Sequence, residues 1–135
     1  MDAGFGKWKV DMDRSQGVEE YALASGTPKE YCTKEVISKS VVTISMDGDE
    51  FVSKTEVPGM PAREIRFKIG VPFEYEAADG RKFKITTTYE DGKIVETVVT
   101  DKGEEAVTVR EFIGDEIKAT TTSMGKTSVQ YMVKA

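Results

Sequence analysis

Residues Ala106–Phe112 read AVTVREF, and their alternation is typical of a β-strand. One side of that strand carries Val107 and Val109, and the other carries Ala106, Thr108, Arg110 and Phe112. If Arg110 points into the fold, it is a cation in apolar surroundings that needs an anionic partner, such as a ligand carboxylate. If Arg110 points outward, it is an ordinary solvated strand residue. This stretch alone leaves both orientations open.

Turn-forming glycines divide the chain from Ser40 onward into short segments rich in threonine and β-branched residues. They recur every 10 to 12 positions, at Gly48, Gly59, Gly70, Gly80, Gly92, Gly103, Gly114 and Gly125. This spacing fits one strand plus one tight turn, repeated. Together with an alternating strand over residues 6–12, the sequence predicts about ten antiparallel strands with short hairpin links.

The only helical pattern follows the first strand. Apolar and small residues recur at helical spacing at Val18, Tyr21, Ala22 and Ser25, and Gly26 can end that helix. Thr27, Pro28 and Glu30 then form a capping box for a second helix, whose shared face would carry Tyr31, Cys32 and Val36. We therefore predict a helix–turn–helix over about residues 16–37, with Cys32 packed and with Lys29 and Lys34 on the solvent face.

Short hairpin links favour an up-and-down meander that closes on itself. The predicted fold is all-β: a ten-stranded antiparallel up-and-down β-barrel, with the helix pair as a lid over one mouth and Trp8 in the core at the closed end. A barrel of about ten strands has more room than its own side chains fill. Alternating threonines indicate an interior that is not a dry core: Thr86, Thr88, Thr97, Thr108 and Thr121.

Length, charge and composition restrict the class of protein. The 135 residues fit one domain over residues 1–135, and a net charge of −5 argues against general nucleic-acid binding. No apolar run approaches the ~20 residues of a membrane helix, and MDAGFGKWKV lacks the apolar core of a signal peptide. The single cysteine cannot form an internal disulfide, and together these features favour a reducing, cytoplasmic compartment. We also expect a monomer.

The sequence also lacks the residues that most enzymes use. It has no histidine, which removes the commonest general base and metal ligand. It has no nucleophile elbow and no phosphate-binding glycine loop. We therefore expect no enzymatic activity, no catalytic or metal-binding residues and no cofactor.

Several motifs stand in order along nearly the whole chain: Phe5–Val10, the helix pair, Glu64–Gly70, Ala78–Lys82 and Val109–Glu111. This set resembles the intracellular lipid-binding proteins, meaning the fatty-acid-binding and cellular retinoid-binding proteins. The resemblance implies a ten-stranded barrel, or β-clam, with a helix–turn–helix lid and a water-containing cavity. It also implies non-covalent binding and intracellular transport of a long-chain fatty acid or a similar hydrophobic ligand.

The resemblance carries over to particular residues. Arg110 matches the family's inward-facing arginine near the ligand carboxylate, which favours the inward orientation. Tyr131 matches the tyrosine of the family's Arg-x-Tyr, but Val129 stands at the arginine position, and alternation points the adjacent Gln130 away from Tyr131. The other implied ligand contacts are a polar pair near the portal, a portal-loop residue, a lid residue and a strand residue: Asp79, Arg81, Met60, Tyr21 and Thr121.

Two other interpretations stay open. Because Val129 lowers the capacity to bind an anion, the ligand could be a retinoid or another neutral lipid. Alternatively, the chain could be an interaction protein that keeps the fold while its lipid site has drifted. If the chain carries a fatty acid, a retinoid or another lipid, we expect the lid to contact membranes transiently through Lys29 and Lys34.

Overall fold

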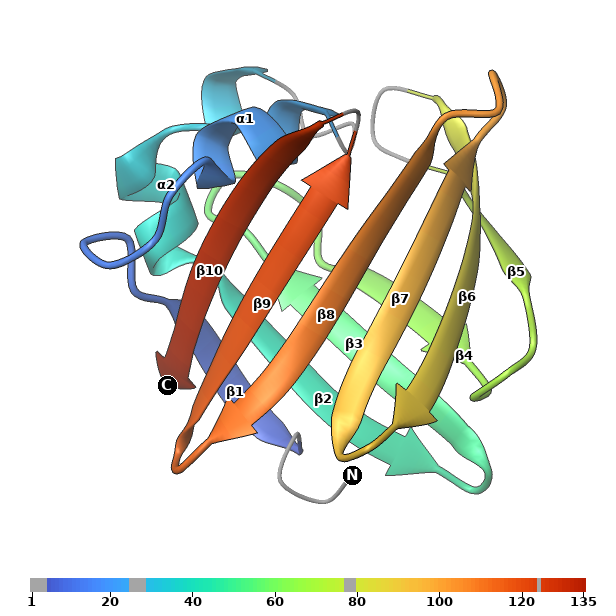
Figure 1. The fold of residues 1–135 in the computed structure, drawn as a ribbon. Coiled ribbons are helices and arrows are strands. Elements are labelled where there is room, and N and C mark those ends of the chain that lie inside the picture. The colour runs from blue at the N-terminus through green and yellow to red at the C-terminus, as the bar shows by residue number, and fades with distance from the viewer. Residues whose placement is uncertain (1–4, 25–28, 77–79, 124) are drawn as a thin grey trace.

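One antiparallel sheet of ten strands curls into a nearly closed barrel (Figure 1). The computed structural model describes residues 5–24, 29–76, 80–123 and 125–135. The strands are β1 (Gly6–Val10), β2 (Val41–Asp47), β3 (Glu50–Glu56), β4 (Arg63–Phe67), β5 (Phe73–Glu76), β6 (Lys82–Glu90), β7 (Lys93–Thr100), β8 (Glu105–Ile113), β9 (Glu116–Ser123) and β10 (Lys126–Lys134). The predicted ten-stranded antiparallel barrel is confirmed.

Among the described residues, the two edge strands of the sheet are not paired by a backbone hydrogen-bond ladder. The strand order is β4-β3-β2-β1-β10-β9-β8-β7-β6-β5, so β1 joins the amino-terminal strands to β10, and β4 and β5 are the edges. The link at Gly70 is therefore not the hydrogen-bonded hairpin that its glycine predicts. Between these edges, the rings of Phe67 and Phe73 stack with centroids 5.7 Å apart, and Arg63 donates to the Glu76 carbonyl at 3.0 Å. We call this gap the seam.

The turn glycines have the backbone conformation that the predicted turns require. All of them have positive φ, ranging from 60° at Gly114 to 86° at Gly80. Glycine adopts this left-handed region without the steric cost that a Cβ atom would add. The regular spacing of glycines in the sequence thus corresponds to real chain reversals.

The lid lies over one mouth of the barrel (Figure 1) and consists of α1 (Val18–Ala24), the 3-10 helix η2 (Lys29–Tyr31) and α2 (Lys34–Lys39). The capping-box prediction for α2 is wrong. Thr33 is the N-cap, because its extended backbone lets its hydroxyl accept from the Val36 amide. Glu30 lies in η2, and the prediction for Thr27 and Pro28 lies outside the described residues.

Other predictions for the lid are confirmed. Cys32 is buried, while Lys29 and Lys34 are exposed. Burial, followed by the nearby charges of Glu19 and Glu30, raises the pKa of the Cys32 thiol. This side chain is therefore a packed residue rather than an activated nucleophile.

The segment that leads into the lid is attached to β10. Gln16 and Val129 exchange two backbone hydrogen bonds of 2.8 Å. At Gly17, φ is +72°, and a Cβ atom would lie 3.1 Å from the Cβ of Ser128. Glycine is needed here both for its backbone conformation and for this close approach. These contacts fix the start of α1 above β10.

The main apolar cluster of the described residues lies around Trp8. Trp8 is 2% exposed and forms a buried cluster with Ile117 and Met132. Partly buried side chains from neighbouring strands pack against the cluster: Val10, Val42, Ile44 and Phe112. A second cluster joins Phe83 and Ile85 to Phe73, Tyr75 and Val98. The prediction that Trp8 is a core residue is confirmed.

We predict that Trp8→Ala lowers the free energy of unfolding by about 3–5 kcal/mol, because it removes the largest buried side chain and leaves a cavity. Urea unfolding monitored by circular dichroism measures this change. The control is Tyr89→Ala, since Tyr89 is 43% exposed and its loss should cost much less. Equal losses in the two variants would contradict the central role of Trp8 in packing.

Candidate functional site

The cross-strand register shows which side chains enter the barrel. In the buried cluster, Met132 lies opposite Ile117, and Ile117 lies opposite Phe112. Side chains alternate along a strand, so the side chain two residues from Phe112 shares its face. That residue is Arg110, which therefore points inward.

Arg110 has an anionic partner within the chain. Its Nη1 lies 3.1 Å from Oε2 of Glu96 on the neighbouring strand β7. Glu96 lies directly opposite Thr108, two residues from Arg110 and on the same face. The interior cation is thus already paired before any ligand arrives. Sequence reasoning missed Glu96, although the β7–β8 hairpin register around Gly103 would have placed it on the Arg110 face.

Electrostatics and accessibility together describe the surroundings of this pair. Burial alone would lower the pKa of Arg110, but the charge of Glu96, then Tyr21 and the hydrogen bond to Glu96, raise it above its ordinary value. The side chains of Arg110 and Glu96 nevertheless keep 29% and 22% of their surface accessible to water. Because a packed core leaves no such surface, we infer that the barrel has water-sized space beside the pair.

Hydroxyl groups surround the ion pair. Tyr21 reaches inward from α1 and is hydrogen-bonded to Thr108, whose Oγ1 lies 2.7 Å from that of Thr121. Burial, followed by the charge of Glu96, raises the pKa of the Tyr21 hydroxyl. Thr87 is buried directly opposite Glu96. The structure therefore brings Tyr21 and Thr121 together with Arg110.

The predicted threonine lining is partly wrong. Thr108 and Thr121 point inward, but Thr86, Thr88 and Thr97 share the opposite face. The register explains this difference, because Thr87, opposite Glu96, is the inward residue of its segment, and Thr86 lies opposite Thr97. Neighbours of an inward residue point outward.

The predicted headgroup role of Tyr131 and Val129 is corrected by the register. Tyr131 lies opposite Lys118, which lies opposite Glu111, so Tyr131 is on the outer face. Its ring packs against the Arg14 guanidinium at 4.9 Å. Val129 lies two residues from Tyr131 on the same strand, so its side chain is also on the outer face. The β9–β10 pairing runs without a bulge, so the inward residue opposite Ala119, itself opposite Arg110, is Gln130.

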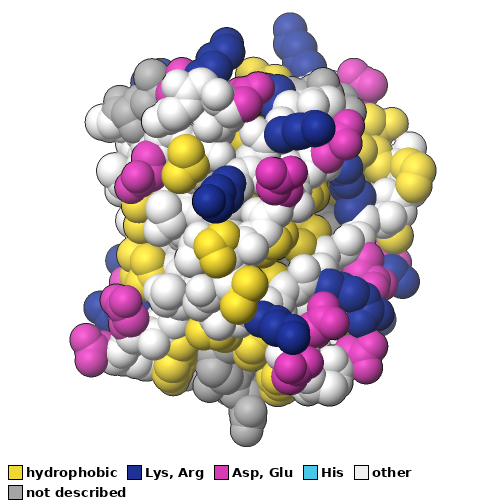
Figure 2. Space-filling model, turned by 90° about the vertical axis from the view of Figure 1, so that its right-hand side faces the viewer, with side chains coloured by type: hydrophobic (Ala, Val, Ile, Leu, Met, Phe, Trp, Pro, Cys, Tyr) yellow, Lys and Arg dark blue, Asp and Glu magenta, His cyan; other side chains and the backbone are white. Residues whose placement is uncertain are grey.

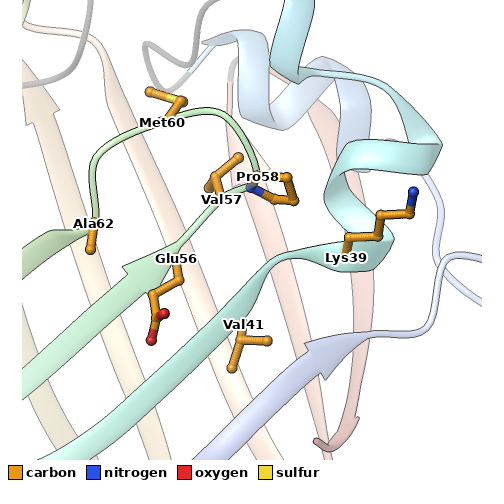
Figure 3. A pocket seen from close by; sticks show the side chains of 7 residues that line it. All are labelled: Lys39, Val41, Glu56, Val57, Pro58, Met60 and Ala62. Atoms are coloured by element: carbon orange, nitrogen blue, oxygen red, sulfur yellow. The ribbon is translucent and has the colours of Figure 1, made fainter.

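Met60 and Arg81, which were predicted as ligand contacts, both lie at the mouth of the barrel. Met60 lies in the β3–β4 loop and lines a hollow of about 410 Å³ together with Lys39, Val41, Glu56, Val57, Pro58 and Ala62 (Figure 3). It also lines a second hollow of about 470 Å³ beside Arg63 and Tyr75 at the seam.

The side of the molecule that carries β5 and β6 mixes positive, negative and apolar side chains (Figure 2).

Hydrogen bonds between described residues attach the lid to the rim of the barrel. Tyr31 donates to the Gly59 carbonyl at 3.1 Å, and Arg81 donates to the Leu23 carbonyl at 3.0 Å. The Arg81 guanidinium also lies 5.7 Å from the centre of the Phe83 ring. Arg81 therefore connects lid and rim rather than joining the Glu96–Arg110 pair. The predicted partner Asp79 lies outside the described residues.

Within the described ranges, no group of three or more acidic, cysteine or histidine side chains is arranged to hold a metal ion. None of the described helices is long and apolar enough to cross a membrane. The polar groups described above, Glu96, Arg110 and the hydroxyl groups around them, offer hydrogen bonds and charge to the interior.

Comparisons with known proteins agree with this geometry. The model of the Lipocalin / cytosolic fatty-acid binding protein family matches residues 6–134. A fatty acid-binding protein of Lepidoglyphus destructor is 32% identical over 93% of this chain and 92% of its own length. Cellular retinoic acid-binding protein 1 of Gallus gallus is 36% identical over 83% of each chain. Lipid binding protein 8 of Caenorhabditis elegans shares the fold, with a TM-score of 0.81 at 21% identity over 100% of this chain and 97% of that protein.

We predict that Arg14→Gln lowers stability near neutral pH and that the difference vanishes in acid. On the outer face, hydrogen bonds from Arg14 hold the pKa values of Asp11 and Glu116 below their ordinary values. A lowered carboxyl pKa stabilises the fold above the unfolded-state pKa of about 4 and loses that effect as pH falls through the folded-state value.

Urea unfolding at a series of pH values tests this prediction. Lys102→Gln, which changes an exposed turn lysine, is the control and should differ little from the parent at every pH. A gap between Arg14→Gln and the parent protein that stays constant down to strongly acidic pH would show that Arg14 does not act through these carboxylates.

Proposed function

We propose that this chain, which belongs to the Lipocalin / cytosolic fatty-acid binding protein family, is a non-covalent carrier of a hydrophobic ligand. The ligand would lie inside the barrel as a long-chain fatty acid or a similar lipid, the class named by the fatty acid-binding relative. The observation that carries the proposal is the water-accessible Glu96–Arg110 pair on the inner face of the sheet. A barrel built only for stability has no need of such an interior.

The energetics favour the ligand tail as the source of affinity. Burying a chain of about 16 carbons at ~0.8 kcal/mol per methylene group gives about 12 kcal/mol. Association and ordering cost about 4–15 kcal/mol, and one charge-assisted hydrogen bond contributes about 1.5–3 kcal/mol. The headgroup contacts therefore set orientation and choice of ligand more than total affinity.

The proposed roles follow from position. Arg110 binds the polar headgroup, with Tyr21 and Thr121 as hydroxyl neighbours. Met60 and Arg81 lie at the mouth, where the lid and the β3–β4 loop would part to admit the ligand. We further propose that the chain works as a single-domain, monomeric carrier in the cytoplasm and not as an enzyme.

Ligand titration of the delipidated protein tests this function. We predict saturable binding of hexadecanoic acid, retinol or retinoic acid, measured by displacement of a fluorescent fatty-acid probe and by native mass spectrometry. Tyr21→Phe should weaken binding by about 0.5–1.5 kcal/mol, because it removes one interior hydrogen-bonding group.

Tyr131→Phe is the matched control, because it removes the same hydroxyl from the outer face and should leave binding unchanged. A folded protein without saturable binding of any of these lipids would contradict the carrier function. That result would favour the alternative of an interaction protein that keeps only the fold.

We also propose transient contact between the lid and anionic membranes. Lys29 and Lys34 are exposed on the lid, although Lys34 pairs with Asp13 at 2.9 Å. Basic residues near an anionic surface contribute about 1 kcal/mol each. We therefore predict that the double variant K29E/K34E slows transfer of a fluorescent fatty acid to vesicles that contain phosphatidylserine.

The double variant K68E/K93E provides the matched control. It makes the same change in net charge, but Lys68 and Lys93 border the β4–β5 and β6–β7 turns at the end of the barrel opposite the lid (Figure 1). Its transfer rate should stay close to that of the parent protein. Equal slowing by both double variants would point to net charge alone and would remove the lid from the proposal.

A further inference from the structure

The inner face around Arg110 has no net charge. The direct cross-strand neighbours of Arg110 are Ile94 and Ala119, and those of Glu96 are Thr87 and Thr108. The next inward residue beyond Ala119 is the uncharged Gln130. In the part of the barrel that these residues form, Arg110 is thus the single cation and Glu96 the single anion.

This charge balance disfavours a carboxylate headgroup. A ligand carboxylate at Arg110 would share one guanidinium with the carboxylate of Glu96, at a site where burial strengthens repulsion between like charges. If the ligand displaced Glu96, the 3.1 Å contact with Arg110 would be lost, and Glu96 would stay inside the barrel without its partner. In both cases, a ligand carboxylate gains less binding free energy from Arg110 than it would without Glu96.

A hydroxyl headgroup fits the same pair without this conflict. A hydroxyl donates one hydrogen bond and accepts others, whereas an ionised carboxylate only accepts and a guanidinium only donates. It can therefore donate to Glu96 and accept from Arg110 at the same time. Arg110 has further N–H groups besides the one that contacts Glu96.

We propose that Glu96 is a specificity-determining residue that makes this barrel prefer a long-chain lipid with an uncharged hydroxyl headgroup over the matching carboxylate. This inference rests on the proposed carrier function and specifies the headgroup class of its ligand. It assigns a role to a residue that a sequence pattern alone presents as an ordinary strand glutamate.

The test compares hexadecanoic acid with hexadecanol by probe displacement at neutral pH, using the delipidated full-length protein. In the parent protein, hexadecanol should bind at least as tightly as the acid. Glu96→Gln leaves one net positive charge in this part of the barrel, so it should tighten acid binding about 10- to 100-fold, the scale of one charge-assisted hydrogen bond, and change alcohol binding only slightly.

Two further variants complete the series. Arg110→Gln should weaken acid binding relative to alcohol binding by a similar factor, because it leaves Glu96 as the net charge. The double variant E96Q/R110Q is neutral again, so its acid-to-alcohol ratio should return toward that of the parent. Glu111→Gln is the control for overall charge, because Glu111 lies one residue from Arg110 but on the outer face.

The outcomes separate this inference from the function on which it rests. If both lipids bind and Glu96→Gln leaves their ratio unchanged, or if the parent protein binds the acid more tightly than the alcohol, the carrier function stands and the role of Glu96 falls. If neither lipid binds to any folded variant, the carrier function itself fails. Should Glu96→Gln fail to fold, Arg110→Gln tests the same charge dependence with the opposite sign.

Discussion

Alternation of side chains along ten hydrogen-bonded strands determines which residues reach the interior, and the site depends on it at every position. Arg110, Ala119 and Gln130 form one cross-strand row on the inner face. The next row, Glu111, Lys118 and Tyr131, lies on the outer face. A shift of one residue exchanges the two rows, so a tyrosine that could bind a ligand instead supports a surface arginine.

The Glu96–Arg110 pair illustrates how a barrel can hold charge away from bulk solvent. The two residues are diagonal neighbours on adjacent strands, which brings long side chains within reach of each other. Removing two charges from water is costly, so such a pair is weak evidence for stability. Its residual contact with water and its hydroxyl neighbours lower that cost. In the proposed carrier, the pair fixes the orientation of Arg110 and would set the charge that a ligand meets.

Much of the fold could be predicted because its signals are local. Each turn glycine reports a backbone conformation that few other residues adopt, and the run of such turns gives the strand count. The N-cap of α2 could not be assigned in the same way, because Thr27 and Thr33 both precede a plausible first helical turn. The structure forms a short 3-10 helix over Lys29–Tyr31, and α2 begins only after Thr33. Glu96 was missed for a different reason: a glutamate in a threonine-rich strand resembles a solvated residue until its register with Arg110 is known. The misplacement of Tyr131 followed from matching a motif by residue type, whereas the inward position is fixed by pairing with β9.

The seam between β4 and β5 gives the barrel an anisotropic stiffness. Elsewhere, widening the wall means breaking a ladder of backbone hydrogen bonds. Along the described part of the seam, it means separating the Phe67–Phe73 stack and breaking the hydrogen bond from Arg63 to the Glu76 carbonyl. A bulky ligand would therefore strain the barrel mainly at the seam. The wall can yield there while β7 to β10, which carry Glu96, Arg110 and Gln130, keep their register. Under the proposed function, the barrel would widen for the ligand tail while the residues proposed to contact the headgroup keep their positions.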